Sequence, residues 1–135
     1  MSTKIFVNLP VQDLDRSVAF FTKLGFSFNP DFTDENATSM VIGEDIFVML
    51  LVKKFFQTFT PKPIADAHST TEVITSFSVD SKERVDELLD IAFSAGAKPS
   101  SETQDMGWMY SRGFEDLDGH LWEFAYMDIN AFPQS

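Results

Sequence analysis

Few side chains in this sequence could do chemistry, and Glu123 is the foremost of them. It lies in the apolar run of residues 121–124, where an ionised carboxylate is costly to bury without a partner. If Phe114 pairs with Leu121 across the intervening loop, antiparallel counting places Arg112 opposite Glu123 on one face of the sheet. The sequence therefore predicts an internal salt bridge between Arg112 and Glu123, or a pocket carboxylate that serves a ligand. The two roles are compatible.

Other groups that could act in catalysis are sparse. The two histidines, His68 and His120, are far apart in the sequence, and neither belongs to a His-x-x-x-His or Glu-x-x-His pattern. His120 adjoins a predicted turn and His68 lies in a polar stretch, so a solvated imidazole is the simplest interpretation of each. The sequence has no glycine-rich phosphate loop, so a nucleotide cofactor is not expected. Its lack of cysteine excludes disulfides, thiolate zinc sites and a cysteine nucleophile.

Aromatic residues alternate along the segment that precedes Glu123. Trp108, Tyr110, Arg112 and Phe114 would share one face of a strand and form an aromatic wall with one cation. Packing in the core explains such a stripe by itself, but apolar walls with a few polar groups also form small-molecule clefts. We therefore name Trp108, Tyr110 and Arg112 as candidate ligand-binding residues.

The elements that would position these residues recur in the same order in both halves of the chain. The first half opens with an apolar strand over residues 5–11 and a helix over 13–25, and the second with a strand over 73–79 and a helix over 80–96. Each helix begins at an aspartate, a good N-cap, and stops at a glycine. Three further strands are predicted in each half, over 26–28, 39–42 and 46–52, and over 97–100, 108–114 and 121–126. Each half thus reads β, α, β, β, β.

This doubled pattern and two motifs resemble the vicinal oxygen chelate superfamily. The first motif is Asn-Leu-Pro-Val-Gln-Asp-Leu-Asp-Arg-Ser over residues 8–17, followed by Phe-Phe and Leu-Gly-Phe; the second covers residues 114–124 and contains Asp-Gly-His. The superfamily includes glyoxalase I, bleomycin and fosfomycin resistance proteins and extradiol dioxygenases. The chain looks most similar to bacterial predicted lactoylglutathione lyases.

The resemblance covers nearly the whole chain and implies a fold class. We expect an α+β, glyoxalase-like fold in which two βαβββ modules form a curved, cleft-enclosing mixed sheet. Residues 1–135 would then be a single glyoxalase-like domain. Its parts would be module 1 (about 4–53), a connection (about 54–71) and module 2 (about 72–127).

Catalytic members of the superfamily hold one divalent metal with four residues that are usually His or Glu. On this sequence those positions fall on Phe6, near Met49, on Ile74 or a neighbour, and on Glu123. A zinc, iron or nickel site needs three or four nitrogen or oxygen donors, and only Glu123 supplies one. The resemblance thus implies that the usual metal site is lost, with no metal ligands and no cofactor. Phe6, Met49 and Ile74 then become candidate ligand-binding residues, and a divalent metal with other donors is the alternative.

Charge and hydropathy narrow the possible partners. The formal net charge is −11, the wrong sign for nucleic acid or an anionic membrane surface. The longest apolar run, residues 46–52, is far too short to span a bilayer, and the N-terminus lacks the pattern of a signal peptide. We therefore expect a soluble, cytoplasmic protein whose partner is a small molecule.

Three functions remain open. The first is a metal-independent homodimer that sequesters or senses a small hydrophobic or aromatic molecule, with the phenylalanines 55, 56 and 59 offering an apolar interface. The second is a glyoxalase-like, metal-dependent lyase or dioxygenase with noncanonical ligands, such as Glu123 with His120 or a residue of a second subunit. The third is a metal-free lyase or isomerase, similar to lactoylglutathione lyase, in which Glu123 is a catalytic general base.

Overall fold

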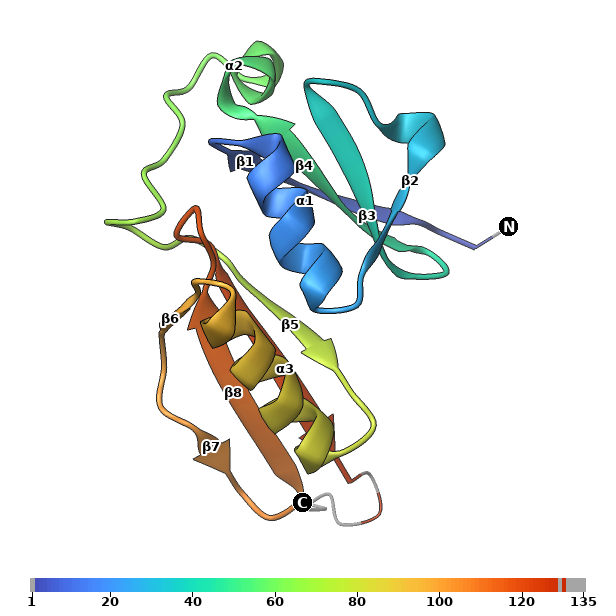
Figure 1. Ribbon diagram of the computed structural model, residues 1–135, viewed down its shortest axis with the longest axis vertical. Coiled ribbons are helices and arrows are strands. Elements are labelled where there is room, and N and C mark those ends of the chain that lie inside the picture. The colour runs from blue at the N-terminus through green and yellow to red at the C-terminus, as the bar shows by residue number, and fades with distance from the viewer. Residues whose placement is uncertain (1, 129, 131–135) are drawn as a thin grey trace. The chain divides into compact units, whose positions relative to one another are not determined.

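The computed structural model describes residues 2–128 and 130, and it divides the chain into two compact units, residues 1–65 and 66–135 (Figure 1). The elements of the first unit are β1 (Ile5–Val11), α1 (Leu14–Lys23), β2 (Ser27–Asn29), η1 (Pro30–Phe32), β3 (Ala37–Gly43), β4 (Ile46–Val52), α2 (Lys53–Phe56) and η2 (Gln57–Phe59). Those of the second are β5 (Ile74–Ser78), α3 (Lys82–Ser94), β6 (Lys98–Pro99), β7 (Gln104–Asp105), β8 (Met109–Glu115) and β9 (Leu121–Met127).

The sheet of the first unit has the strand order β1-β4-β3-β2. Strands β1 and β4 are parallel, as a strand–helix–strand crossover requires, and the other neighbours are antiparallel. Helix α1 begins as predicted, because the side chain of Asp13 accepts a hydrogen bond from the amide of Arg16 at 3.1 Å. It ends before Gly25, whose φ of 95° only glycine adopts readily. The first βαβββ module is therefore confirmed.

The second unit repeats this arrangement, with the strand order β5-β9-β8-β6 and parallel pairing of β5 with β9. Its helix α3 begins one residue later than predicted, because Ser81 rather than Asp80 is the N-cap; the Ser81 hydroxyl accepts from the amide of Arg84 at 3.1 Å. Strand β7 was not expected, because its two polar residues show no alternation of apolar and polar side chains. It pairs with the N-terminal part of β8, where Gln104 and Asp105 lie opposite Ser111 and Tyr110. The predicted α+β, glyoxalase-like fold is confirmed.

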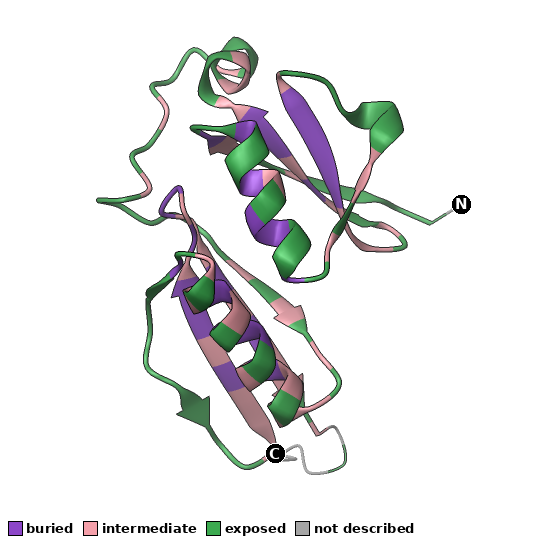
Figure 2. Ribbon diagram, in the orientation of Figure 1, coloured by how far each residue is buried: buried purple, intermediate pink, exposed green. Residues whose placement is uncertain are grey.

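The core of the second unit lies between its sheet and α3. Trp122, Phe114 and Phe124 alternate on one face of β8 and β9 and are almost completely buried. The buried stripe of α3 faces them with Val85, Leu88, Leu89 and Ala92 (Figure 2). Burying a large apolar side chain stabilises a fold by about 1.5–3 kcal/mol. This face of the sheet is therefore a packed layer, and α3, the helix that the described residues of this unit form, leaves the opposite face open.

The end of the first unit is ordered but exposes aromatic surface. The rings of Phe55 and Phe59 meet edge to face, with 5.1 Å between their centroids, and Phe59 is 68% exposed. Among the described residues, no helix is long and apolar enough to cross a membrane.

Candidate functional site

The register of β8 and β9 decides which side chains share a face with Glu123. Gly113 lies opposite Glu123, and Arg112 lies opposite Phe124. The predicted pairing of Arg112 with Glu123 is therefore wrong by one residue. Because side chains alternate along a strand, a shift of one residue sends the two groups to opposite faces of the sheet.

The loop between these strands accounts for the difference. The strands stay paired out to Glu115 and Leu121, and residues 116–120 form a tight turn. Inside it, one carboxylate oxygen of Asp116 accepts from the amides of Asp118 and His120, at 2.8 and 3.0 Å, and the other accepts from Trp122 Nε1 at 2.7 Å. Burial raises the pKa of Asp116, while the charge of His120 and these hydrogen bonds act in the opposite direction. Asp116 thus fixes the turn and the register together.

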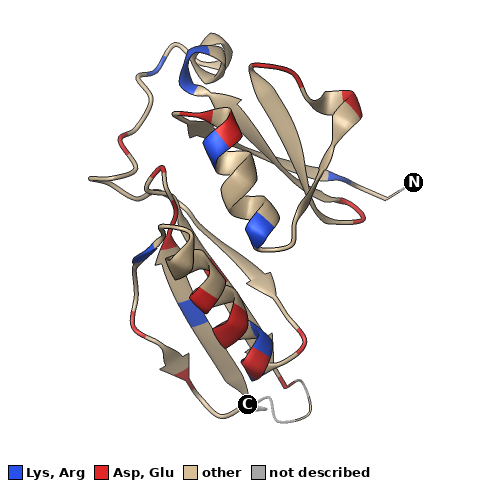
Figure 3. Cartoon of the chain, in the orientation of Figure 1, with Lys and Arg blue, Asp and Glu red and all other residues tan. Residues whose placement is uncertain are grey.

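Arg112 pairs with helix α3 instead of Glu123. Its guanidinium donates to Oδ1 of Asp86 at 2.8 Å, and the hydroxyl of Tyr110 donates to the same oxygen at 2.7 Å. These two hydrogen bonds lower the pKa of Asp86, and the bond from Tyr110 contributes more than the bond from Arg112. The hydrogen bond between Tyr110 and Asp86 also raises the pKa of Tyr110. Acidic positions recur along α3 (Figure 3), so a cation on the strand beneath it is well placed.

The predicted ligand-binding residues of β8 therefore belong to the helix-covered face. Tyr110 and Arg112 hold α3 against the sheet, and neither lines the pocket described below. Trp108 precedes β8, and its carbonyl accepts from the amide of Asp128 at 2.7 Å. These contacts account for Tyr110 and Arg112 without a ligand, and a ligand role for all three residues stays a prediction.

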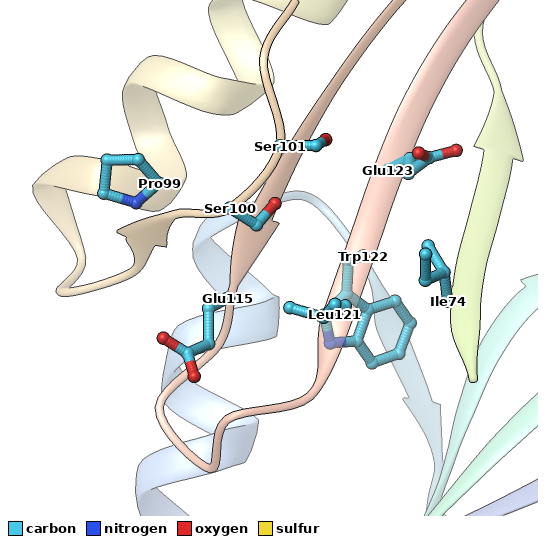
Figure 4. A pocket seen from close by; sticks show the side chains of 8 residues that line it. All are labelled: Ile74, Pro99, Ser100, Ser101, Glu115, Leu121, Trp122 and Glu123. Carbon is cyan, nitrogen blue, oxygen red and sulfur yellow. The ribbon is translucent and has the colours of Figure 1, made fainter. Parts of the chain in front are cut away.

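A pocket lies on the open face of the second sheet, with a volume of about 400 Å³ (Figure 4). It contains two of the predicted site residues, Glu123 and Ile74. Ser100 and Ser101 stand to one side of Glu123 and Ile74 to the other. The complete lining is Ile74, Pro99, Ser100, Ser101, Glu115, Leu121, Trp122 and Glu123.

Glu123 is half-buried at the centre of this face. Ser76, its partner on β5, donates a hydroxyl hydrogen bond to Oε1 of Glu123 at 2.5 Å. The eight lining residues include two carboxylates, those of Glu115 and Glu123, and no Lys, Arg or His. Lys98 lies opposite Glu115 in the register of β6 and β8. This lysine is therefore a neighbour of Glu115 and not of Glu123.

Gly113 explains how the serines reach this face. A Cβ atom at Gly113 would lie 2.8 Å from Oγ of Ser100 and 3.2 Å from Oγ of Ser101. The absence of a side chain therefore lets both hydroxyls lie directly on β8 beside Glu123. Sequence reasoning missed Gly113 and the serines at 76, 100 and 101. A glycine inside a predicted strand is a recognised sign of such close approach and could have indicated them.

The other two predicted residues lie in the first unit. Phe6 and Met49 both occupy the sheet face that α1 leaves open. Phe6 is 51% exposed, and its ring stacks on that of Phe47 with a centroid separation of 5.0 Å. Met49 lies opposite Asn8 of β1. The equivalent pair in the second sheet is Ser76 and Glu123. At matching positions, the first module thus has an amide and a thioether, and the second has a hydroxyl and a carboxylate.

These positions do not fit a divalent metal. Phe6, Met49 and Ile74 have no nitrogen or oxygen donor in their side chains, and a neutral serine hydroxyl adds little to the single carboxylate of Glu123. Over residues 2–128 and 130, no three His, Cys, Asp or Glu side chains gather closely enough to hold an ion. The donor set therefore lacks the composition of the superfamily's metal site.

Known proteins share this architecture. Residues 3–43 match the family described as bleomycin resistance protein-like N-terminal. A hypothetical protein from S. aureus is 32% identical, with a TM-score of 0.79 over 93% of this chain and 95% of that one. A glyoxalase/bleomycin resistance protein/dioxygenase family enzyme from Burkholderia phytofirmans PsJN is 17% identical, with a TM-score of 0.77 over 93% and 99%.

A genomically encoded fosfomycin resistance protein from Listeria monocytogenes is 18% identical and covers 96% of this chain and 97% of its own, with a TM-score of 0.69. No protein of curated function matches the sequence. Two βαβββ modules with these strand orders define the glyoxalase-like class of α+β proteins. The match of residues 3–43 and this fold support the resemblance of the chain to the vicinal oxygen chelate superfamily, the group of glyoxalases, bleomycin resistance proteins and dioxygenases.

Proposed function

We propose that the protein binds a small hydrophobic or aromatic molecule in the pocket over its second sheet, without a metal at the superfamily's position. The observation that carries this proposal is the pocket around Glu123. Its volume of about 400 Å³ lies within the usual range for small-molecule sites, roughly 300–1,000 Å³. Ile74, Pro99 and Leu121 supply apolar walls, and the hydroxyls of Ser100 and Ser101 with the carboxylates of Glu115 and Glu123 supply the few polar contacts.

The donor set supports binding without metal chemistry. Three of the four positions that would hold an ion are occupied by side chains that cannot coordinate one, and Ile74, one of these three, lines the pocket as part of its apolar wall. The protein would then sequester or sense its ligand. A homodimer and a cytoplasmic location belong to the same proposal.

A neutral aromatic probe tests the location of the site. Adding benzyl alcohol to ¹⁵N-labelled protein should shift the amide signals of residues 74–76, 99–101 and 121–123. Ile74→Ala should weaken this binding, whereas Ile46→Ala should leave it unchanged. The two isoleucines are a matched pair, 53% and 46% exposed at strand starts, and Ile46 lies in the other unit. Shifts confined to other residues, or equal effects of both substitutions, would contradict the proposal.

A metal-dependent lyase or dioxygenase is the second candidate, and the presence of Glu123 at a metal-ligand position favours it. The fosfomycin resistance protein of Listeria monocytogenes, 17% identical with a TM-score of 0.69, has been solved in complex with Mn(II) and sulfate. Metal analysis of protein purified without a tag separates the candidates. Near-stoichiometric Zn, Ni, Mn or Fe that disappears in Glu123→Gln would establish the metalloprotein and overturn our proposal.

A further inference from the structure

We infer that the ligand of this pocket carries a protonated nitrogen, and that Glu123 receives it. This inference rests on the proposed function and names its ligand class. The ligand is a small organic cation, a primary amine or an amidine, attached to an apolar or aromatic body.

Among the described residues, no basic side chain pairs with Glu123. Arg112, the expected partner, lies on the opposite face and bonds to Asp86. The ion pairs among the described residues do not include Glu123, and the pocket lining has no basic side chain. Lys98 is matched by register to Glu115. Within the described residues, the hydroxyl of Ser76 is the group that hydrogen-bonds to Glu123.

The carboxylate of Glu123 determines which ligand charge the pocket favours. A half-buried carboxylate with one neutral donor gains charge-assisted hydrogen bonds from an ammonium or amidinium group, and such bonds are roughly twice as strong as neutral ones. An anionic ligand would meet two carboxylates with no basic residue in the lining, in a protein whose net charge is −11. The site therefore discriminates by charge: it favours cations and rejects anions.

The pocket also offers acceptors for the remaining N–H donors of such a ligand. An ammonium group has three N–H donors and needs three acceptors. Beside the carboxylate of Glu123, the hydroxyl oxygens of Ser76, Ser100 and Ser101 can accept, the last two because Gly113 lets them lie on this face. A metal ion would find at most the carboxylates of Glu123 and Glu115 and neutral hydroxyls, and among the described residues no three His, Cys, Asp or Glu side chains gather closely enough to hold one. The carbon body of an amine would contact Ile74, Leu121 and Pro99.

Three probes with one ring separate the possibilities: benzylamine, which is protonated at neutral pH, benzyl alcohol, which is neutral, and benzoate, which is an anion. We expect benzylamine to bind about tenfold more tightly than benzyl alcohol, because a hydrogen bond to a charged group is worth more than a neutral one. Benzoate should bind more weakly than either. Amide shifts of the lining residues, followed by titration, give both the location and the affinity.

Variants assign the preference to Glu123. Glu123→Gln keeps the shape of the side chain and should reduce the preference for benzylamine to less than about threefold, because the remaining amide makes only neutral hydrogen bonds. Glu87→Gln is the matched control. Glu87 lies on α3, is exposed and pairs with Arg84 at 2.6 Å, so its substitution should leave the preference intact. Both variants should give the dispersed spectra of a folded chain.

Each remaining outcome decides against the inference. If benzyl alcohol or benzoate binds in the pocket as tightly as benzylamine, the ligand class is wrong and the proposed function stands. If no probe shifts the lining residues, both fail. If Mn²⁺ or Zn²⁺ binds, displaces benzylamine and loses its affinity in Glu123→Gln, a metal rather than an organic cation neutralises Glu123.

Discussion

Gly113 and Glu123 lie opposite each other on β8 and β9, and the glycine is what brings other polar groups to the glutamate. A residue with a side chain at this position would fill the space that the hydroxyls of Ser100 and Ser101 occupy. The shape of the pocket therefore depends on the lack of a side chain at Gly113 as well as on the eight residues that line it.

The first prediction concerns this glycine. In Gly113→Ala the new Cβ would lie 2.8 Å from Oγ of Ser100 and 3.1 Å from the carbonyl oxygen of Trp122, so the Ser100 segment must move. We expect a loss of about 1–3 kcal/mol in the free energy of unfolding, typical of overpacking, together with weaker binding of benzyl alcohol. Urea unfolding and amide shifts measure the two effects.

The control for this prediction is Gly43→Ala. A Cβ at Gly43 would lie no closer than 3.6 Å to another side chain, which is ordinary contact. This substitution should change the free energy of unfolding by less than about 0.5 kcal/mol. Equal losses in the two variants would mean that close approach of the serines is not what position 113 requires.

The second prediction concerns Asp116. Asp116→Ala leaves Trp122 Nε1 and the amides of Asp118 and His120 without their acceptor in a buried turn. Each unsatisfied buried donor costs about 1–3 kcal/mol, so we expect a loss of at least about 3 kcal/mol in the free energy of unfolding. Asp116→Asn keeps one acceptor oxygen and should lose less. Thermal or urea unfolding checks the order, and a loss below 1 kcal/mol for Ala would contradict it.

The third prediction is a pH dependence from Asp86. Its pKa in the folded protein is lowered below 3.8, so its contribution to stability is complete above about pH 5 and is lost as the pH falls through 3.8 and below. Asp86→Asn should therefore destabilise the protein at pH 7, and this difference should shrink toward pH 3. Because Asp86 is half exposed, we expect only about 0.5–1 kcal/mol.

Tyr110→Phe provides the independent check on this cluster. It removes the hydrogen bond that contributes most to the lowered pKa of Asp86. The effects of Asp86→Asn and Tyr110→Phe should be less than additive when combined, because both remove the same contact. Urea unfolding at pH 7 and pH 3 measures all four proteins. A difference that grows as the pH falls would contradict the assignment.

The fourth prediction concerns assembly through the exposed aromatic segment. At micromolar concentration we expect light scattering to give about twice 15.3 kDa. Phe59→Ser should shift the protein toward monomer, since Phe59 is 68% exposed and large exposed aromatic surface favours an interface. Phe32→Ser, at a residue 62% exposed on η1, is the control that should leave the mass unchanged. A wild-type monomer would end this proposal.

Local chemistry made much of the fold predictable. The N-cap at Asp13 and the glycines at 25 and 96 mark helix ends because each satisfies a requirement of the adjacent backbone, and the structure has all three in those roles. Alternation of apolar residues likewise identified β8 and β9. These signals act within a few residues of the chain, so the sequence alone is sufficient to show two βαβββ modules and the motif that contains Glu123.

What the tertiary structure decided is which residues meet. Alternation tells which side chains share a face of one strand, but the register between β8 and β9 depends on how Asp116 closes the turn between them. That one-residue difference moved Arg112 to Asp86 and left Glu123 with Ser76. The approach of Ser100 and Ser101 over Gly113 is likewise a contact between segments distant in the sequence. Because such contacts depend on packing and loop closure together, no local pattern contains them.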